Sequence, residues 1–205
     1  GYGYASKTFH APLISGTPGM TLAAVSSSDE KKVLADWPAV QVVAAPQALF
    51  SDPNIDLVAI PTPNDTHFPL AKAALEAGKH VVVDKPFTVT LAQARELEAI
   101  AKSEGRLLSV FHNRRWDSDF LTVKSLINEG LLGEVVYFES HFDRYRPQVR
   151  QRWREQGGPG SGIWYDLAPH LLDQVVNLFG LPVSMQVDLA QLRPGSQSTD
   201  YFHAV

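Results

Sequence analysis

The stretch HVVVDKPF, residues 80–87, begins as an apolar run and ends in an acid, a lysine and a proline. Three consecutive valines favour a strand that is buried on both faces, as the strands of a parallel sheet are. A charged end on such a strand indicates that Asp84 and Lys85 meet something other than the core.

Three other short apolar runs have the same character, at residues 22–26, 55–61 and 106–111. Helical patterns lie between the later runs, at residues 69–78 and 90–105. In the second helix Thr90 and Gln93 have the spacing of a capping box, and Gly105 can end the helix in the left-handed conformation. Strands that alternate with helices predict βαβ units, in which a parallel sheet carries helices on both faces.

The pattern changes after about residue 117. A helical pattern near residues 120–130 leads to GEVVYFESHF, residues 133–142, which alternates like a strand with one solvated face. A helix at about 164–179 and a second alternating strand at 183–189 follow. The sequence therefore predicts an α/β protein, with a parallel-sheet domain over residues 1–116 and an α+β domain with a largely antiparallel sheet over residues 117–205.

Both ends of the chain raise a further expectation. The chain begins with GYGYAS, residues 1–6, without the strand that precedes such a turn in a parallel sheet, and it stops in an apparent strand, residues 200–205. We therefore expect the first strand of the parallel sheet and part of the second sheet to be missing. We also expect the natural protein to be longer at both ends.

Composition argues against several classes of function. The 205 residues are 44% hydrophobic and 20% charged, which is ordinary for a globular protein with a core. A net charge of -4 gives no electrostatic reason to expect nucleic acid or an anionic membrane as a partner. Cysteine is absent, and no apolar run has the roughly 18 residues of a membrane span. We expect a cytoplasmic protein without a membrane segment or a metal centre.

The opening GYGYAS contains part of a dinucleotide-binding pattern. Gly1 and Gly3 match the first two glycines of G-x-G-x-x-G, which allow a tight turn and a close approach of the backbone to a pyrophosphate. The third glycine is replaced by Ser6, which predicts slightly looser helix packing beneath the pyrophosphate. The candidate cofactor contacts here are Gly1, Gly3, Tyr4, Ala5 and Ser6. An ordinary strand-to-helix turn is the alternative.

Two loops follow predicted parallel strands and would lie at the same edge of the sheet, where ligands of open α/β sheets bind. The first, IPTPNDTH, residues 60–67, places Thr62, Asn64 and His67 toward a ribose or nicotinamide, with Pro63 between them. The second contains Lys85, whose ammonium group Asp84 can hold in place. The alternatives are a rigid turn and a solvated lysine.

The segment GIWYDLAPHLLD, residues 162–173, carries an acid and a histidine four residues apart. On a helix, Asp166 and His170 share one face, so the carboxylate can orient the imidazole as a base. A structural histidine is the alternative. Pro169 removes a backbone donor, so we expect the helix to start late or to kink there.

In this order, the motifs GYGYAS, TPNDTH, DKP, NRRW (residues 113–116), GEV and GIWYDLAPH resemble those of the Gfo/Idh/MocA oxidoreductases. The resemblance implies a Rossmann-type domain that binds a nicotinamide cofactor, and hydride transfer to or from a sugar, polyol or related small molecule. It implies that Lys85 holds the substrate hydroxyl, that His170 is the general base and that Asp166 completes the site. Asn113 and Arg115 of NRRW join Asp84 and Lys85 as candidate cofactor contacts.

The resemblance also implies a homodimer or higher homo-oligomer formed through the sheet of the second domain. Asp84 departs from the glutamate of the family motif and is one methylene shorter, so its hydrogen-bond partner can differ. Two alternatives of the same fold are a non-catalytic protein that senses nicotinamide nucleotides and an enzyme similar to biliverdin reductase. The presence of both Lys85 and His170 favours an enzyme over a sensor, and Asp166 with His170 favours a CH-OH substrate over a tetrapyrrole.

The strand at residues 22–26 predicts which nicotinamide cofactor is preferred. Folds that prefer NAD place an acid at the end of this strand, where it binds the ribose hydroxyls and would repel a 2'-phosphate. Here the strand ends in Ser26, Ser27 and Ser28, followed by Asp29 and by the two lysines at 31 and 32. We therefore expect NADP(H) to be preferred, with NAD(H) possible. The alternative is that the serines cap the next helix and the lysines are solvated.

Five arginines lie within eleven residues, at positions 144, 146, 150, 152 and 154. Such a cluster is compatible with a solvated surface or an interface. With Tyr145 and Trp153 it could also line the mouth of a site for a hydroxylated or anionic substrate.

Overall fold

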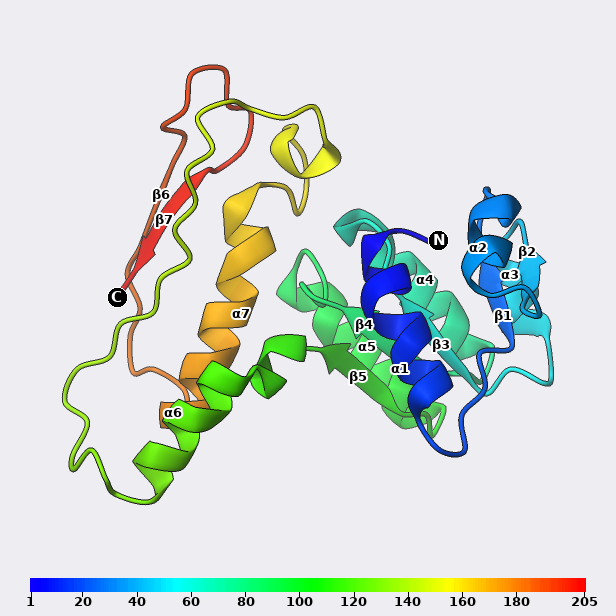
Figure 1. The fold of residues 1–205 in the computed structure, drawn as a ribbon, viewed down its shortest axis with the longest axis horizontal. Helices are drawn as coiled ribbons and strands as arrows, with labels where there is room; N and C mark the ends of the chain where they lie inside the picture. Colours follow the sequence, from blue (N-terminus) through cyan, green and yellow to red (C-terminus); the bar gives the residue numbers. More distant parts are fainter. The chain divides into compact units, whose positions relative to one another are not determined.

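A computed structural model describes all 205 residues (Figure 1). The chain forms two compact units, Gly1–Phe111 and His112–Val205. Each unit is described below by itself. No helix in either unit is both long and apolar enough to cross a membrane.

The strands of the first unit are all parallel. They are β1 (Ala24–Ser26), β2 (Gln41–Val43), β3 (Leu57–Ile60), β4 (His80–Asp84) and β5 (Leu108–Phe111). β1 pairs with β2, and β3, β4 and β5 form a second sheet in that order. The parallel sheet and the four expected strands are confirmed, and β2 is a further strand that the sequence patterns did not predict.

The helices of the first unit are η1 (Ser6–His10), α1 (Ala11–Gly16), α2 (Glu30–Asp36), α3 (Gln47–Ser51), α4 (Asn64–Glu76) and α5 (Leu91–Ser103). In Figure 1, α1 lies in front of the β3–β5 strands, and α4 and α5 lie behind them. α4 begins five residues earlier than the pattern predicted and continues through Pro69. The predicted loop TPNDTH is therefore mostly the first turn of a helix.

The core of the first unit contains the valine run of residues 81–83. Val81 and Val83 of β4 are 1% and 0% exposed and pack with Leu75 of α4 and Leu97 of α5. The predicted capping box at Thr90 is present. The apolar run therefore builds the sheet centre, and its charged end emerges beyond the core.

The second unit contains η2 (Asn113–Trp116), α6 (Ser118–Asn128), η3 (Trp153–Glu155), α7 (Gly162–Phe179) and the antiparallel pair β6 (Val187–Ala190) and β7 (Tyr201–Ala204). Of the two expectations for Pro169, a late start of α7 is wrong, since the helix begins seven residues before the proline and continues through it, and a kink at Pro169 stays a prediction. At Gly162 (φ +88) an added Cβ would lie 2.9 Å from the carbonyl oxygen of Thr199, and Ile163 N donates to that oxygen at 2.6 Å. Backbone contact therefore fixes the start of α7.

The predicted strand at residues 133–142 does not form. Residues 135–147 have no regular secondary structure, and neither β6 nor β7 pairs with them. A strand needs a hydrogen-bonded neighbour, which alternation alone does not supply. One side of the predicted pattern remains, since the ring of Phe138 lies 5.3 Å from that of Phe179, but Val136 is 87% exposed.

Candidate functional site

The carboxyl ends of β3 and β4 are joined by a buried histidine. His67 is 0% exposed, and its Nδ1 lies 2.8 Å from the carbonyl oxygen of Pro86 while its Nε2 lies 2.9 Å from that of Thr62. The expectation that His67 faces a ribose or nicotinamide is corrected here, because both ring nitrogens are directed at backbone carbonyls. His67 instead holds together the two loops that the sequence singled out.

The other residues of the first loop lie around the start of α4. Asn64 is the first residue of the helix and is 4% exposed. The hydroxyl of Thr66 lies 2.7 Å from the hydroxyl of Thr62 and 2.6 Å from the carbonyl of Pro63. The loop is thus held by its own polar groups as well as by His67.

The fingerprint turn leaves space where its glycines stand. An added Cβ at Gly1 or Gly3 would meet no protein atom within 4 Å. The Ser6 hydroxyl is buried and donates to the carbonyl of Gly1 at 2.6 Å, while Tyr4 is 77% exposed and Ala5 is half-buried. Since no protein group fills this space, the turn fits a phosphate-bearing ligand that approaches the backbone closely.

A polar cluster that the sequence did not indicate fixes this turn to the end of α2. Tyr2 is 5% exposed, and its hydroxyl donates to Asp36 at 3.0 Å and accepts from Trp37 Nε1 at 2.8 Å. Lys7 also pairs with Asp36, at 2.8 Å. Hydrogen bonds from Lys7 and then Tyr2 hold the pKa of Asp36 below its usual value. Tyr2 escaped attention because it occupies the variable position of G-x-G.

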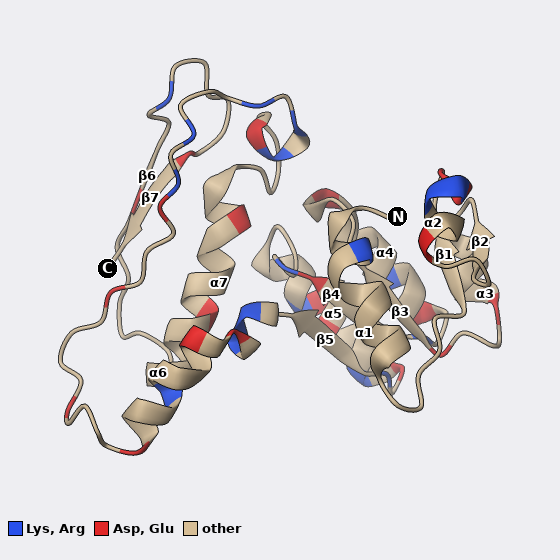
Figure 2. Ribbon diagram, viewed as in Figure 1, with Lys and Arg blue, Asp and Glu red and all other residues tan.

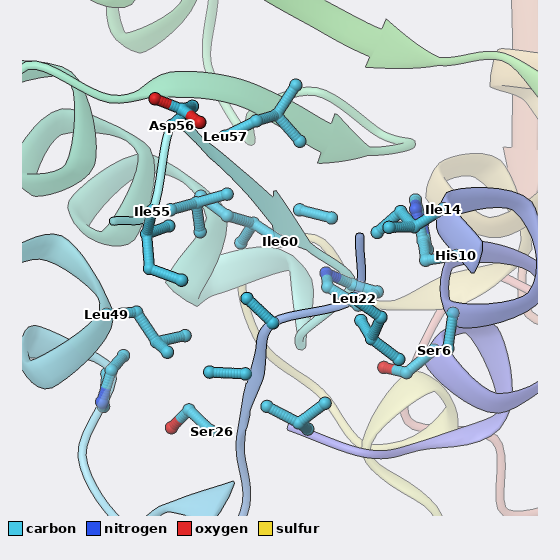
Figure 3. Close-up of a pocket in the computed structure, with 18 of the residues that line it drawn as sticks. Ser6, His10, Ile14, Leu22, Ser26, Leu49, Ile55, Asp56, Leu57 and Ile60 are labelled. Atoms are coloured by element: carbon cyan, nitrogen blue, oxygen red, sulfur yellow. The ribbon is translucent and has the colours of Figure 1, made fainter. Parts of the chain in front are cut away.

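A cavity of about 490 Å³ brings four of the predicted cofactor residues together, and they are Gly1, Ser6, Ser26 and Thr62. Figure 3 labels Ser6 and Ser26 among its lining residues. Apolar side chains form much of the remaining wall, including Leu57 and Ile60 of β3 and Leu22, which precedes β1 (Figure 3). Because β1 and β3 are not hydrogen-bonded to each other, part of this cavity is a gap between strand edges. Its polar rim, at the carboxyl ends of β1 and β3, is the part that suits a nucleotide.

The segment after β1 shows which residue caps α2. Asp29 accepts a hydrogen bond from Lys32 N at 3.0 Å, and Ser27 Oγ accepts one from Asp29 N at 3.1 Å. The aspartate, rather than the serines, therefore caps the helix. Ser26 and Ser27 are half-buried and Ser28 is exposed. One carboxylate oxygen of Asp29 is thus used as the cap of α2.

The loop after β4 carries Lys85, which is half-buried. The carboxylate of the preceding Asp84 lies 3.6 Å from Nε2 of His10. His10 is 6% exposed, and its ring centroid lies 4.4 Å from that of Phe111. Asp84 therefore connects η1 to the end of β4, a link that no local motif in the sequence could reveal.

The second unit holds the remaining catalytic candidates. Asp166 and His170 lie one turn apart on α7, and His170 is 7% exposed. The carboxylate of Asp166 lies 3.4 Å from Nε of Arg154, and the ring of Phe142 lies 6.4 Å from that of His170. Lys85 belongs to the first unit, so the three-residue site remains a prediction.

Two predicted cofactor contacts lie in η2, at the start of the second unit. Arg115 donates from Nε and Nη2 to the two carboxylate oxygens of Asp173, at 2.7 and 2.6 Å. These hydrogen bonds raise the pKa of Arg115, with burial opposing. One edge of the Arg115 guanidinium is therefore bound to Asp173. That Asn113 and Arg115 contact the cofactor stays a prediction.

Comparison with known proteins follows the same division of the chain. Residues 1–112 match the oxidoreductase family with the NAD-binding Rossmann fold, and residues 124–205 match the C-terminal alpha/beta domain of that family. The structure of biliverdin reductase from Synechocystis sp. PCC 6803, in complex with biliverdin and NADP+, is 28% identical with a TM-score of 0.81. The matched region covers 98% of this chain and 64% of the biliverdin reductase chain.

Two curated relatives match over almost all of the chain. The "Uncharacterized oxidoreductase YdgJ" of Escherichia coli (strain K12) is 83% identical over 205 residues, which is 100% of this chain and 59% of that protein. The scyllo-inositol 2-dehydrogenase (NADP(+)) IolW of Bacillus subtilis (strain 168) is 40% identical over 203 residues, which is 99% of this chain and 57% of that protein. The chain thus spans less than two thirds of the length of either relative. Because both of its domains match in order, the chain belongs to the Gfo/Idh/MocA family of oxidoreductases.

Proposed function

We propose that the protein is an NAD(P)-dependent oxidoreductase that transfers hydride between a nicotinamide cofactor and a CH-OH group of a sugar, polyol or related small molecule. The observation that carries this proposal is the polar rim at the carboxyl ends of β1 and β3, where Gly1, Ser6, Ser26 and Thr62 meet. The tie from His67 to Pro86 brings the loop of Lys85 to the same edge of the sheet.

The residues of the first unit would hold the cofactor in three places. The open space at Gly1 and Gly3 would take the pyrophosphate, and the serines after β1 would take the adenosine ribose. Thr62 and Asn64 would face the nicotinamide end. The bound nicotinamide would accept or supply the hydride.

The protein's own groups would supply the proton chemistry. An alcohol gives up hydride readily only as its proton leaves, so the reaction needs a base and a cation near the developing alkoxide. We assign the base to His170 and the cation to Lys85. Asp166, one turn from His170 on α7, would complete the site.

We further propose that NADP(H) is the preferred cofactor. Asp29, the acid that could have bound ribose hydroxyls, accepts a hydrogen bond from Lys32 N as the cap of α2. Small hydroxyls at Ser26 and Ser27 can donate to a 2'-phosphate, and the exposed Lys31 can help to neutralise it. The name of the relative IolW specifies NADP(+), which agrees with this choice.

Titration of the protein with NADPH and NADH at fixed ionic strength tests both parts of the proposal. We expect saturable binding of both nucleotides, with NADPH binding more tightly. Ser27→Asp should shift the preference toward NADH, whereas Ser103→Asp, an equal charge change on exposed α5 surface, should not. Equal or tighter binding of NADH would overturn the NADP preference, and binding of neither nucleotide would overturn the cofactor site.

Turnover separates the enzyme from its two alternatives. A panel of sugars, polyols and aldehydes with each nucleotide, followed at the nicotinamide absorbance, should reveal an oxidisable or reducible substrate. Nucleotide binding without any turnover would favour a sensor, and turnover of biliverdin alone would favour a tetrapyrrole reductase. A homodimer and a cytoplasmic location stay predictions, which sedimentation and cell fractionation can test.

A further inference from the structure

The second unit contains a cavity that is rich in arginine. Its volume is about 310 Å³, and Asp166 on α7 forms part of its wall. Five arginines and three acidic residues line it, and they are Arg144, Arg146, Arg152, Arg154, Arg193, Glu155, Asp166 and Asp200. Figure 2 shows basic and acidic stretches of chain near the first turns of α7. The net charge of the pocket wall depends on which arginines the three acids pair with.

Two of the acids are engaged by two of the arginines. Glu155, whose side chain is 7% exposed, accepts from Arg152 Nε at 2.7 Å and lies 3.2 Å from Arg193 Nη2. Asp200 lies 2.9 Å from Arg193 Nε. Burial acts to raise the pKa of Glu155, but the hydrogen bonds from Arg150 N and Arg152 outweigh it, so that its pKa is lowered. Both acids are therefore carboxylates with partners at neutral pH.

The third acid is also paired, which leaves two arginines over. Asp166 lies 3.4 Å from Arg154 Nε. Arg144 and Arg146 form no ion pair with any acid. Arg146 is half-buried, and its pKa is lowered, first by burial and then by the charges of Arg144 and its other arginine neighbours. The pocket thus has five arginines against three acids, and neither Arg144 nor Arg146 has an acid within ion-pair distance, although the charge of Glu155 acts on Arg146 in the opposite sense to the arginines.

We propose that this pocket binds an oxyanion group of the substrate, a carboxylate or a phosphate, through Arg144 and Arg146. Guanidinium forks match both groups in bidentate geometry, and the half-buried Arg146 beside the exposed Arg144 gains from a bound anion that offsets their repulsion. The proposal rests on the proposed function and deepens it. Because Asp166 lines the same pocket, the anionic group would bind on the helix that carries the predicted base, His170. The substrate class is then a polyhydroxy acid or a sugar phosphate.

Isothermal titration calorimetry at low ionic strength tests the site without turnover. The probes are D-gluconate, D-glucose 6-phosphate and neutral myo-inositol. We expect at least one of the two anions to bind, and the tighter of them identifies the group. Arg144→Gln combined with Arg146→Gln should weaken that binding at least about tenfold, because two charge-assisted contacts are lost. Neither arginine forms an ion pair within the protein, so the fold should be unaffected.

Arg150→Gln is the matched control, because Arg150 is an exposed arginine of the same segment and does not line the cavity. It should change anion affinity by less than about twofold. No saturable binding of either anion, or equal binding by the double variant and the wild type, would overturn the inference. A parallel NADPH titration separates the two proposals. NADPH binding without anion binding sinks only the oxyanion pocket, and anion binding without NADPH binding sinks only the cofactor proposal.

Discussion

Replacing His67 by phenylalanine tests the tie between the loops that follow β3 and β4. The variant keeps an aromatic ring of similar size and removes both ring nitrogens. The carbonyl of Pro86 then loses its partner in a buried contact, and that of Thr62 in a partly buried one. A buried acceptor left without a partner costs about 1–3 kcal/mol. A neutral imidazole has one N–H and satisfies one carbonyl, whereas an imidazolium satisfies both.

We therefore expect His67→Phe to destabilise the first unit by about 1–3 kcal/mol if His67 makes one hydrogen bond in the wild type. If His67 makes both hydrogen bonds, the loss should reach up to about 5 kcal/mol. Amide hydrogen exchange followed by mass spectrometry can measure this in peptides from β3 and β4, while peptides from α7 report the second unit. His141→Phe is the control, because the His141 side chain is 63% exposed. Its effect should stay within about 0.5 kcal/mol. Protection of β3 and β4 that differs from wild type by no more than the control would refute the role of His67.

Three further outcomes are expected. Lys85→Ala should lower kcat by roughly 10²–10⁴-fold while NADPH affinity stays near the wild-type value, and near-normal turnover would remove the lysine from the mechanism. His170→Ala should flatten the pH profile of kcat, and an unchanged acidic limb would identify another base. The pKa of Glu155 is lowered in the folded state from its ordinary value of 4.5. The ion pairs of Glu155 therefore stabilise the second unit fully at pH values above 4.5, and this stabilisation is lost as the pH falls through the lowered pKa. At pH values below about 4.5 the melting temperature should therefore decrease, and the decrease should be smaller in Glu155→Gln. An equal decrease in the two proteins would contradict the role given to the ion pairs of Glu155.

Sequence patterns predicted the parts of the fold that depend on near neighbours. The capping box at Thr90 and the left-handed Gly105 involve residues within a few positions, and both are present. Pro86, one of the two partners of His67, lies 19 residues away, and Asp36, a partner of Tyr2, lies 34 residues away, so no local pattern could give these contacts. The alternating segment near residue 138 failed as a strand for the same reason, since pairing is a long-range property. Motif order identified the candidate residues, but it could not show that His67 supports the site from within the core.

The two walls around the arginine-rich cavity should respond differently to substitution. Gly162 leaves no room for a side chain beside the backbone of Thr199, so a substitution of Gly162 would displace the start of the helix that carries Asp166. Residues 144–147, which also line the cavity, have no ladder or helical hydrogen bonds for a new side chain to break. In the proposed oxyanion pocket, substitutions at residues 144–147 should therefore change which anions bind, while α7 keeps Asp166 and His170 in place.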